Sequence, residues 1–576
     1  MISKTILHRF RASSTIISFL ILSYALLAVA DTPTRGYELS IYSSTPIIFW
    51  IAIVFGLVNG LFLITSDLYG KMGKMWMVGL FQIVFCNCLV ISLYALRGYV
   101  CLRYDPMSSV GLAKDLYSYG FFGKNIYPIS SILIATFSQF MGVPVLLISN
   151  YLSSVFFIIY IISIYCWSKS LISDRKFILC SLIASTPIFF AWFTTAIYPM
   201  LVSVLTIPFF FYCLQRNIDY RFRLFSIIWL IIYPLFHPIT AIMIFLYLTT
   251  TFIYERIWSR LDEKGNQIST TLIIVSFVTV AGWFIWQYSL LSVFRIVFFQ
   301  FLGILETRTT LSEARFYLFE LGIMNALRSF LLMVADEIIY YFITLIAFFI
   351  LLRDKRFKEK IIPTALCVVV GSFFILIVSI FARLHSFNRF INLNTNMVLT
   401  PTLIGYVLYK SLLNNEKIKT FLILGLIFIS SFTAIFSLYP SPITILPNYQ
   451  VTISDVSGME WLINRKKLEV KTADLKSPVF IYSNLIYGLD FRLGRNDLRP
   501  ALEIPYHFGF GKDNIFPIDE DRYLVIMEFD LEAYTKVWKD LDKFRKEDFI
   551  KVDYCTNVYK IYENGEFRSY FVHEDD

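Results

Sequence analysis

Long apolar runs alternate with short polar segments from the start of the chain to about residue 439. Most runs approach the ~20 residues that a helix needs to cross ~30 Å of hydrocarbon. Prolines in or beside several runs, such as Pro187 and Pro199, blur the helix ends but not their order. The pattern predicts thirteen membrane-spanning helices, at 15–30, 46–65, 76–96, 145–167, 177–194, 199–214, 222–236, 239–254, 271–290, 331–352, 361–381, 397–410 and 420–438.

Lysine and arginine in the connecting loops set the expected orientation, because cytoplasmic loops are enriched in both. With a cytoplasmic N-terminus, the inner loops carry 22 of these residues and the outer loops 11. This places the protein in the plasma membrane with loops 97–144 and 291–330 outside. The first 30 residues also suit a cleaved signal peptide, but twelve further spans favour a retained anchor.

The apolar stretch 126–142 is predicted to lie on the outer surface of the membrane. Serine, threonine and glutamine interrupt its apolar face, at Ser130, Ser131, Thr136, Ser138 and Gln139. Counting this stretch as a crossing would move the basic loop 168–176 and all later basic loops outside. We therefore expect a surface helix.

The region after the last span, 440–576, predicts a small extracytoplasmic α+β domain; the membrane region is 1–439. Runs at 479–482 and 523–527 are typical of strands, and 457–465 and 531–544 of helices. The end of the chain predicts a hairpin over 557–572, in which Asn564-Gly565 favours a type I′ turn.

Composition supports a polytopic α-helical membrane protein: 57% of the 576 residues are hydrophobic, 16% are charged, and the mean hydropathy is +0.64. Loop topology explains the net charge of +9, and no groove-like pattern of basic and aromatic residues indicates a nucleic-acid partner. Phosphate-binding, serine-hydrolase and zinc-protease motifs are absent from the sequence. Cys101 and Cys555 would lie on one side of the membrane, where a bridge between them is conceivable.

Two carboxylates at the membrane surface are the first candidates for chemistry. Asp105 directly follows the third span and precedes Pro106, and Asp115 lies ten residues further along the same amphipathic segment. A carboxylate beside hydrocarbon is costly unless it is solvated, paired or used. Each of the two charges could also simply be solvated in the loop.

Other polar groups are expected on the same face of the membrane. His237 lies in a tight turn between two spans, Arg383, His385 and Arg389 lie between two later ones, and loop 291–330 mixes acids and bases. Cationic groups can bind the phosphate of a lipid-linked sugar donor. An aspartate can take the proton of the group that accepts the sugar. The long loop is typical of a lid that orders over substrate.

The first external loop resembles that of GT-C superfamily glycosyltransferases, which include oligosaccharyltransferases, protein mannosyltransferases and lipid A aminoarabinose transferases. The resemblance rests on the run from Asp105 to Gly120, on Tyr127-Pro128 and on Gly142. More narrowly, Gly36 to Pro46 and Tyr559 to Phe567 look like segments of uncharacterised archaeal members.

The resemblance implies a sugar donor linked to polyprenyl phosphate, an acceptor glycan, lipid or protein, and Asp105 as the catalytic carboxylate. Asp115 would assist it, and Tyr127, His237, Arg383, His385 and Arg389 would bind substrate. Similar proteins carry histidine near two positions that are Ser109 and Ser131 here. The need for a divalent cation stays open, because members of the superfamily differ.

Two other functions fit a multi-pass protein. A transporter or flippase of lipid-linked glycans needs a polar route across the bilayer, yet acidic residues within the predicted spans are nearly limited to Asp336 and Glu337. A non-catalytic membrane assembly protein would use its C-terminal domain, which has no motif of its own. The sequence favours the transferase.

Overall fold

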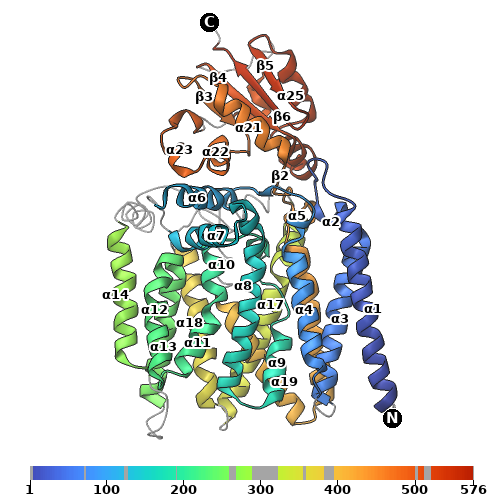
Figure 1. Ribbon diagram of the computed structural model, residues 1–576, viewed down its shortest axis with the longest axis vertical. Helices are drawn as coiled ribbons and strands as arrows, with labels where there is room; N and C mark the ends of the chain where they lie inside the picture. The colour runs from blue at the N-terminus through green and yellow to red at the C-terminus, as the bar shows by residue number, and fades with distance from the viewer. Residues whose placement is uncertain are drawn as a thin grey trace.

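A computed structural model describes residues 4–69, 73–121, 127–189, 191–258, 268–287, 322–354, 358–381, 395–499, 504–510 and 520–574. Upright helices form a bundle, and a small domain with a sheet sits on one end of it (Figure 1). Two helices, α6 and α7, lie across the bundle beneath that domain (Figure 1). We call this end of the bundle the domain face.

Helices occupy all thirteen predicted spans in the described part of the chain: α1 (Lys4–Ala30), α3 (Ile47–Tyr69), α4 (Met75–Ile91), α8 (Val145–Leu171), α9 (Arg175–Ala184), α10 (Pro199–Leu205) with α11 (Ile207–Gln215), α12 (Tyr220–Phe236), α13 (Pro238–Trp258), α14 (Thr270–Trp286), α17 (Ile323–Arg353), α18 (Lys358–Phe381), α19 (Thr400–Leu413) and α20 (Lys417–Ser437). Six described helices, α1, α3, α8, α13, α17 and α20, are long and apolar enough to cross a membrane on their own. The predicted multi-pass helical fold is confirmed.

The span predicted at 177–194 is wrong as a continuous helix. Helix α9 ends at Ala184, before Pro187, and only a short 3-10 turn, η1 (Ala191–Thr194), follows. Ten helical residues cover only ~15 Å. Irregular backbone at membrane depth requires polar partners within the protein. Tyr340 and Asn87 supply them by donating to the carbonyl oxygens of Ala184 and Thr186, at 2.7 and 2.8 Å.

Helices α6 (Asp105–Tyr119) and α7 (Pro128–Met141) are the two elements that lie across the domain face. The serines that interrupt the apolar stretch of α7 pack inward: Ser130, Ser131 and Ser138 are buried, whereas Phe140 is 88% exposed. Small side chains let α7 pack closely against its neighbours. Its large apolar side chains are then left for the lipid side, as in an interfacial helix.

The C-terminal region contains a four-stranded sheet in the order β3-β4-β6-β5. Strands β3 (Lys471–Asp474) and β4 (Arg522–Met527) pair in parallel, and β6 (Phe567–Val572) pairs antiparallel to β4 and to β5 (Val558–Glu563). The predicted strand at 523–527 and the terminal hairpin are thus present. Helices accompany the sheet: α21 (Ile453–Arg465), α22 (Val479–Tyr487), α23 (Leu489–Leu493), α24 (Glu528–Glu532) and α25 (Lys546–Lys551).

Three local predictions in this region are wrong. The strand-like run 479–482 begins helix α22, because a short apolar run does not by itself distinguish a strand from a buried helix. The helix expected over 531–544 breaks after α24 into short turns. In the hairpin turn only Gly565 has a positive φ, so the turn is not type I′, and the Asn564 side chain instead accepts from the Phe567 amide at 3.0 Å.

Segments distant in sequence connect the membrane part to the C-terminal region. Strand β1 (Cys101–Leu102), just before α6, pairs with β2 (Gln450–Val451), just after the last span. The two segments that resemble archaeal proteins also meet, since a Cβ on Gly36 would lie 2.3 Å from Oε1 of Glu566. Cys101 and Cys555 are both free thiols, so they do not form a bridge.

Candidate functional site

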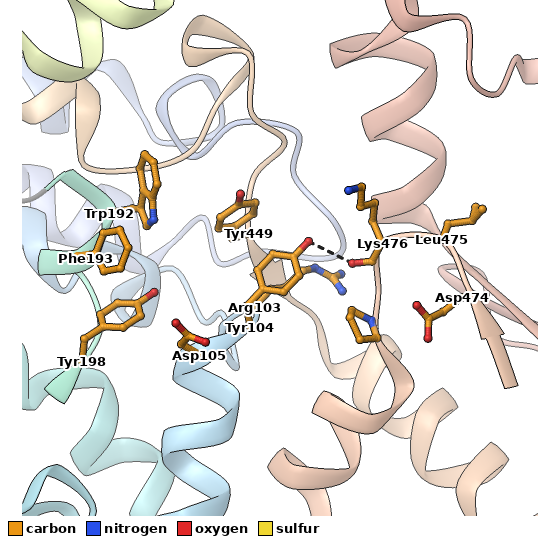
Figure 2. Close-up of a pocket in the computed structure, with 11 residues that line it drawn as sticks. Arg103, Tyr104, Asp105, Trp192, Phe193, Tyr198, Tyr449, Asp474, Leu475 and Lys476 are labelled. Carbon is orange, nitrogen blue, oxygen red and sulfur yellow. Dashed lines mark hydrogen bonds between the residues drawn. The ribbon is translucent and has the colours of Figure 1, made fainter. Parts of the chain in front are cut away.

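A cavity of about 460 Å³ opens at the domain face, where three parts of the chain meet. The start of α6 forms its floor, the irregular segment after α9 one wall, and the C-terminal region the opposite wall (Figure 2). Its lining residues are Arg103, Tyr104, Asp105, Trp192, Phe193, Tyr198, Tyr449, Asp474, Leu475, Lys476 and Pro478.

Asp105 is exposed and lines this cavity as the first residue of α6. Pro106 follows at the second helical position, where its missing N–H costs no helical hydrogen bond. A carboxylate at a helix N-terminus is stabilised by the positive end of the helix dipole. The residue that the sequence singled out therefore lines the cavity, and its catalytic role stays a prediction.

Aromatic rings surround Asp105. Trp192 stacks on Phe193 with ring centroids 5.6 Å apart, and Phe193 packs on Tyr198 at 4.7 Å. Burial, and then the nearby Asp105 carboxylate, raise the pKa of Tyr198 well above its ordinary value, so its phenol stays protonated. Aromatic faces with a few polar groups offer a surface for the C–H face and hydroxyls of a sugar ring.

The opposite wall comes from the segment after β3. The Tyr104 hydroxyl donates to the Lys476 carbonyl oxygen at 3.1 Å (Figure 2), and the exposed Lys476 ammonium lies 5.8 Å from the Trp538 ring centroid. Burial raises the pKa of Asp474 to about 6, although the Val479 amide donates to it. The cavity thus combines two carboxyl groups with one ammonium group.

Asp530 holds this wall in place from behind. Its carboxylate accepts from the Lys476 amide at 3.0 Å and from the Ser477 hydroxyl at 3.3 Å. Burial raises the pKa of Asp530 to about 7 despite a third bond from the Met527 amide. The segment that faces Asp105 is therefore fixed by the fold of the C-terminal region.

Asp115, the second predicted catalytic carboxylate, does not line the cavity. It accepts from the backbone amides of Leu489 and Asp490, at 2.7 and 3.1 Å, and so caps the start of helix α23. A Cβ on Gly488 would lie 1.8 Å from the Asp115 carboxylate, so only glycine fits there. Burial raises the pKa of Asp115, and the two amides oppose this.

Two of the predicted substrate-binding residues lie together. The rings of Tyr127, before α7, and His237, between α12 and α13, have centroids 5.8 Å apart. The Thr240 hydroxyl lies 3.4 Å from Nδ1 of His237. Neither ring is among the residues that line the cavity.

Arg383, His385 and Arg389 lie outside the described residues, as does most of loop 291–330. Ser109 and Ser131, near which the resemblance would have placed histidine, are both buried. In the described ranges, no three histidine, cysteine, aspartate or glutamate side chains cluster in a way that could hold a metal ion.

Two parts of the cavity were missed by sequence reasoning. Arg103, two residues before Asp105, was counted only among the basic residues of the outer loops, yet it is buried and lines the cavity. Trp192 and Phe193 of the aromatic wall were assigned to the predicted span at 177–194, and Tyr198 fell between two predicted spans. The clustering of Trp192, Phe193 and Tyr198 between two prolines was the available signal for an irregular segment.

Comparisons with known proteins find distant similarity in structure only. No protein-family model matches the chain, and no curated protein matches it. An oligosaccharyltransferase from Archaeoglobus fulgidus, in complex with zinc and sulfate, matches with a TM-score of 0.47 and 11% identity over 84% of this chain and 72% of that one.

ArnT from Cupriavidus metallidurans, bound to undecaprenyl phosphate, matches with a TM-score of 0.43 and 9% identity over 87% of this chain and 98% of that one. Its apo form gives the same TM-score and identity over 86% of this chain. At this distance the function has to be argued from the chain's own residues.

Proposed function

We propose that this protein is a membrane glycosyltransferase that moves a sugar from a polyprenyl-phosphate-linked donor to an acceptor at the outer face of the membrane. The observation that carries the proposal is Asp105, exposed at the start of a surface helix and lining an aromatic cavity of about 460 Å³. The cavity lies beside the start of α6, one of the two helices that lie across the domain face (Figure 1).

The chemistry follows from the charge that develops in the reaction. An oxygen or nitrogen of the acceptor forms a bond to the anomeric carbon while the bond from that carbon to the phosphate oxygen breaks. The phosphate leaves with the electron pair of the broken bond. Asp105 takes the acceptor's proton, or orients the acceptor through a hydrogen bond. The rings of Trp192, Phe193 and Tyr198 hold the sugar face.

The phosphate of the donor needs cationic or hydrogen-bonding partners. Lys476 lines the cavity, and Tyr127 and His237 pair on the same face. Arg383, His385 and Arg389 are proposed for this role from the sequence, together with a lid over 291–330. A transporter would need a polar route across the bilayer, whereas this cavity, with its aromatic rings and a carboxylate, lies at one face of the bundle. The cavity therefore supports a transferase over a transporter.

The direct test is release of polyprenyl phosphate or diphosphate. Purified full-length protein is incubated with lipid-linked sugars and candidate acceptors, and the released lipid is measured. Catalytic release that depends on acceptor supports the proposal. Flipping of intact lipid-linked glycan in vesicles, with no release of lipid phosphate, overturns it in favour of a flippase.

Topology supplies a second test, because the proposal needs the domain face to lie outside the cell. The described side chain of Tyr554, in the C-terminal region, is 76% exposed. Tyr554→Cys should react with an impermeant thiol reagent on intact cells. Lys419→Cys, at the opposite end of the bundle, is the matched control and should react only after lysis. The reverse pattern overturns the orientation.

A further inference from the structure

Tyr104, between Arg103 and Asp105, has an unfavourable backbone conformation. Its φ is 71° and its ψ is −120°, which an L-amino acid rarely adopts. Such strain persists only where the surroundings hold it, and it is concentrated at functional sites. The turn immediately precedes the proposed catalytic carboxylate, so whatever holds the turn also sets the direction of Asp105.

Arg103 anchors one side of this turn in the C-terminal region. Its side chain is only 2% exposed and forms an ion pair with Asp455 at 2.6 Å. The guanidinium also donates to the Tyr482 hydroxyl and lies 4.1 Å from the Phe529 ring centroid. Every one of these partners belongs to the C-terminal region, although Arg103 itself follows the third span.

Further contacts fix the turn on its other sides. The Arg103 amide donates to the Tyr449 carbonyl oxygen at 2.8 Å, and the Tyr104 ring packs edge to face on the Tyr449 ring at 5.1 Å. The Tyr104 hydroxyl donates to the carbonyl oxygen of Lys476. The Tyr104 carbonyl oxygen accepts from the amides of Met107 and Ser108, which begin α6.

We propose that Arg103 is a positioning residue: by inserting into the C-terminal region it holds the strained Tyr104 turn, and through it the direction of the Asp105 carboxylate. This inference rests on the proposed function only for its kinetic consequence. It gives the C-terminal domain a role in catalysis, although that domain has no motif of its own. The geometry itself is testable without any substrate.

The test variant is Asp455→Asn, which removes the partner charge and is not among the cavity-lining residues. Amide hydrogen exchange at Met107 and Ser108 should become at least tenfold faster, because the start of α6 loses its anchor. In the transfer assay kcat should fall about tenfold, while the KM for the donor changes less than twofold. Unchanged exchange at these amides overturns the proposal.

The matched control is Asp497→Asn. Asp497 pairs with the buried ammonium of Lys466 in the same region, but neither residue touches the turn. This variant removes the same charge and should destabilise the domain comparably, with wild-type kcat and wild-type exchange at Met107 and Ser108. An equal loss of kcat in the control overturns the proposal, because any weakened domain would then produce it.

The double variant Arg103→Met with Asp455→Asn separates positioning from stability. Removing both members of a buried ion pair costs much less stability than removing one, because no unpaired charge remains. The thermal midpoint should therefore recover while kcat stays low and exchange stays fast. Recovery of kcat together with the thermal midpoint overturns the positioning role.

The proposed transferase activity and the proposed positioning role of Arg103 can fail separately. If the wild-type protein has no transfer activity, the proposed function is rejected. Fast amide exchange at Met107 and Ser108 in Asp455→Asn would still support the anchored turn. Wild-type activity together with normal exchange in Asp455→Asn keeps the transferase and rejects Arg103 as a positioning residue.

Discussion

The two ends of helix α6 carry the same residue type in opposite situations. At its start Asp105 is exposed to an aromatic cavity. Near its end Asp115 accepts two backbone amides from α23. Both were candidates for catalysis on the sequence alone. A carboxylate with one oxygen bound to the start of a helix is fixed by the structure. A carboxylate that lines a cavity can meet a substrate.

The C-terminal region produces this difference. It covers Asp115 with the amides of α23 and, some 15 Å away by the ~1.5 Å rise of a helix, leaves a space above Asp105. The same region supplies Asp474 and Lys476 to the wall of that space. The C-terminal region therefore binds the Asp115 carboxylate and forms the cavity wall opposite Asp105.

The largest effect is expected at the cavity end of α6. Asp105→Asn preserves the shape of the side chain and removes its charge, so turnover should fall by about 10²-fold or more, the scale of a general base. Initial rates of lipid-phosphate release measure this. Thermal unfolding should be nearly unchanged, because asparagine is also tolerated at a helix start. A wild-type rate would show that Asp105 is not the catalytic carboxylate.

A smaller effect is expected from the aromatic wall beside Asp105. Trp192→Ala removes the stacked ring and should raise the KM for the donor by about two- to tenfold, since aromatic contacts contribute ~0.5–1.5 kcal/mol. Trp192→Phe is the matched control and should keep most of the affinity. If both variants have the donor KM of the wild type, the aromatic wall does not bind the sugar.

At the opposite end of α6, a substitution of Asp115 should lower the stability of the protein more than its turnover. Asp115→Ala removes the cap of α23 and should lower the free energy of unfolding by ~0.5–2 kcal/mol. Turnover should stay within about threefold of the wild type, because a cap of this strength leaves most molecules folded. Denaturation and initial rates are measured on the same preparation. A loss of turnover like that of Asp105→Asn would place Asp115 in the catalytic group.

The smallest effect is expected from the Tyr198 hydroxyl. Burial and Asp105 raise the pKa of this phenol, so it stays neutral at every pH below about 10. Tyr198→Phe removes one neutral hydrogen-bond donor and should change kcat by about threefold. The pH dependence of the rate should keep its shape below pH 10. A new or displaced limb in that range would give Tyr198 a role in proton transfer.

Much of the architecture was predictable, because it depends on local composition. Apolar runs of nearly the length of a membrane crossing marked where the helices of the bundle lie, although the one at 177–194 stops as a helix at Ala184. The surface helix α7 and the terminal hairpin were also found. The direction in which α7 turns its side chains was not predicted. Its serines pack inward and its aromatic residues face out.

The sequence by itself determined that this chain is a multi-pass helical protein with a polar segment after its third span, and that Asp105 stands at the start of that segment. Tertiary structure decided the rest of the candidate site. Trp192 reaches the cavity because α9 stops short, and Arg103 is buried because Asp455, some 350 residues later, lies opposite it. Spans follow from the hydrophobicity of contiguous residues. A buried ion pair or a cavity wall depends instead on residues that only the fold brings together.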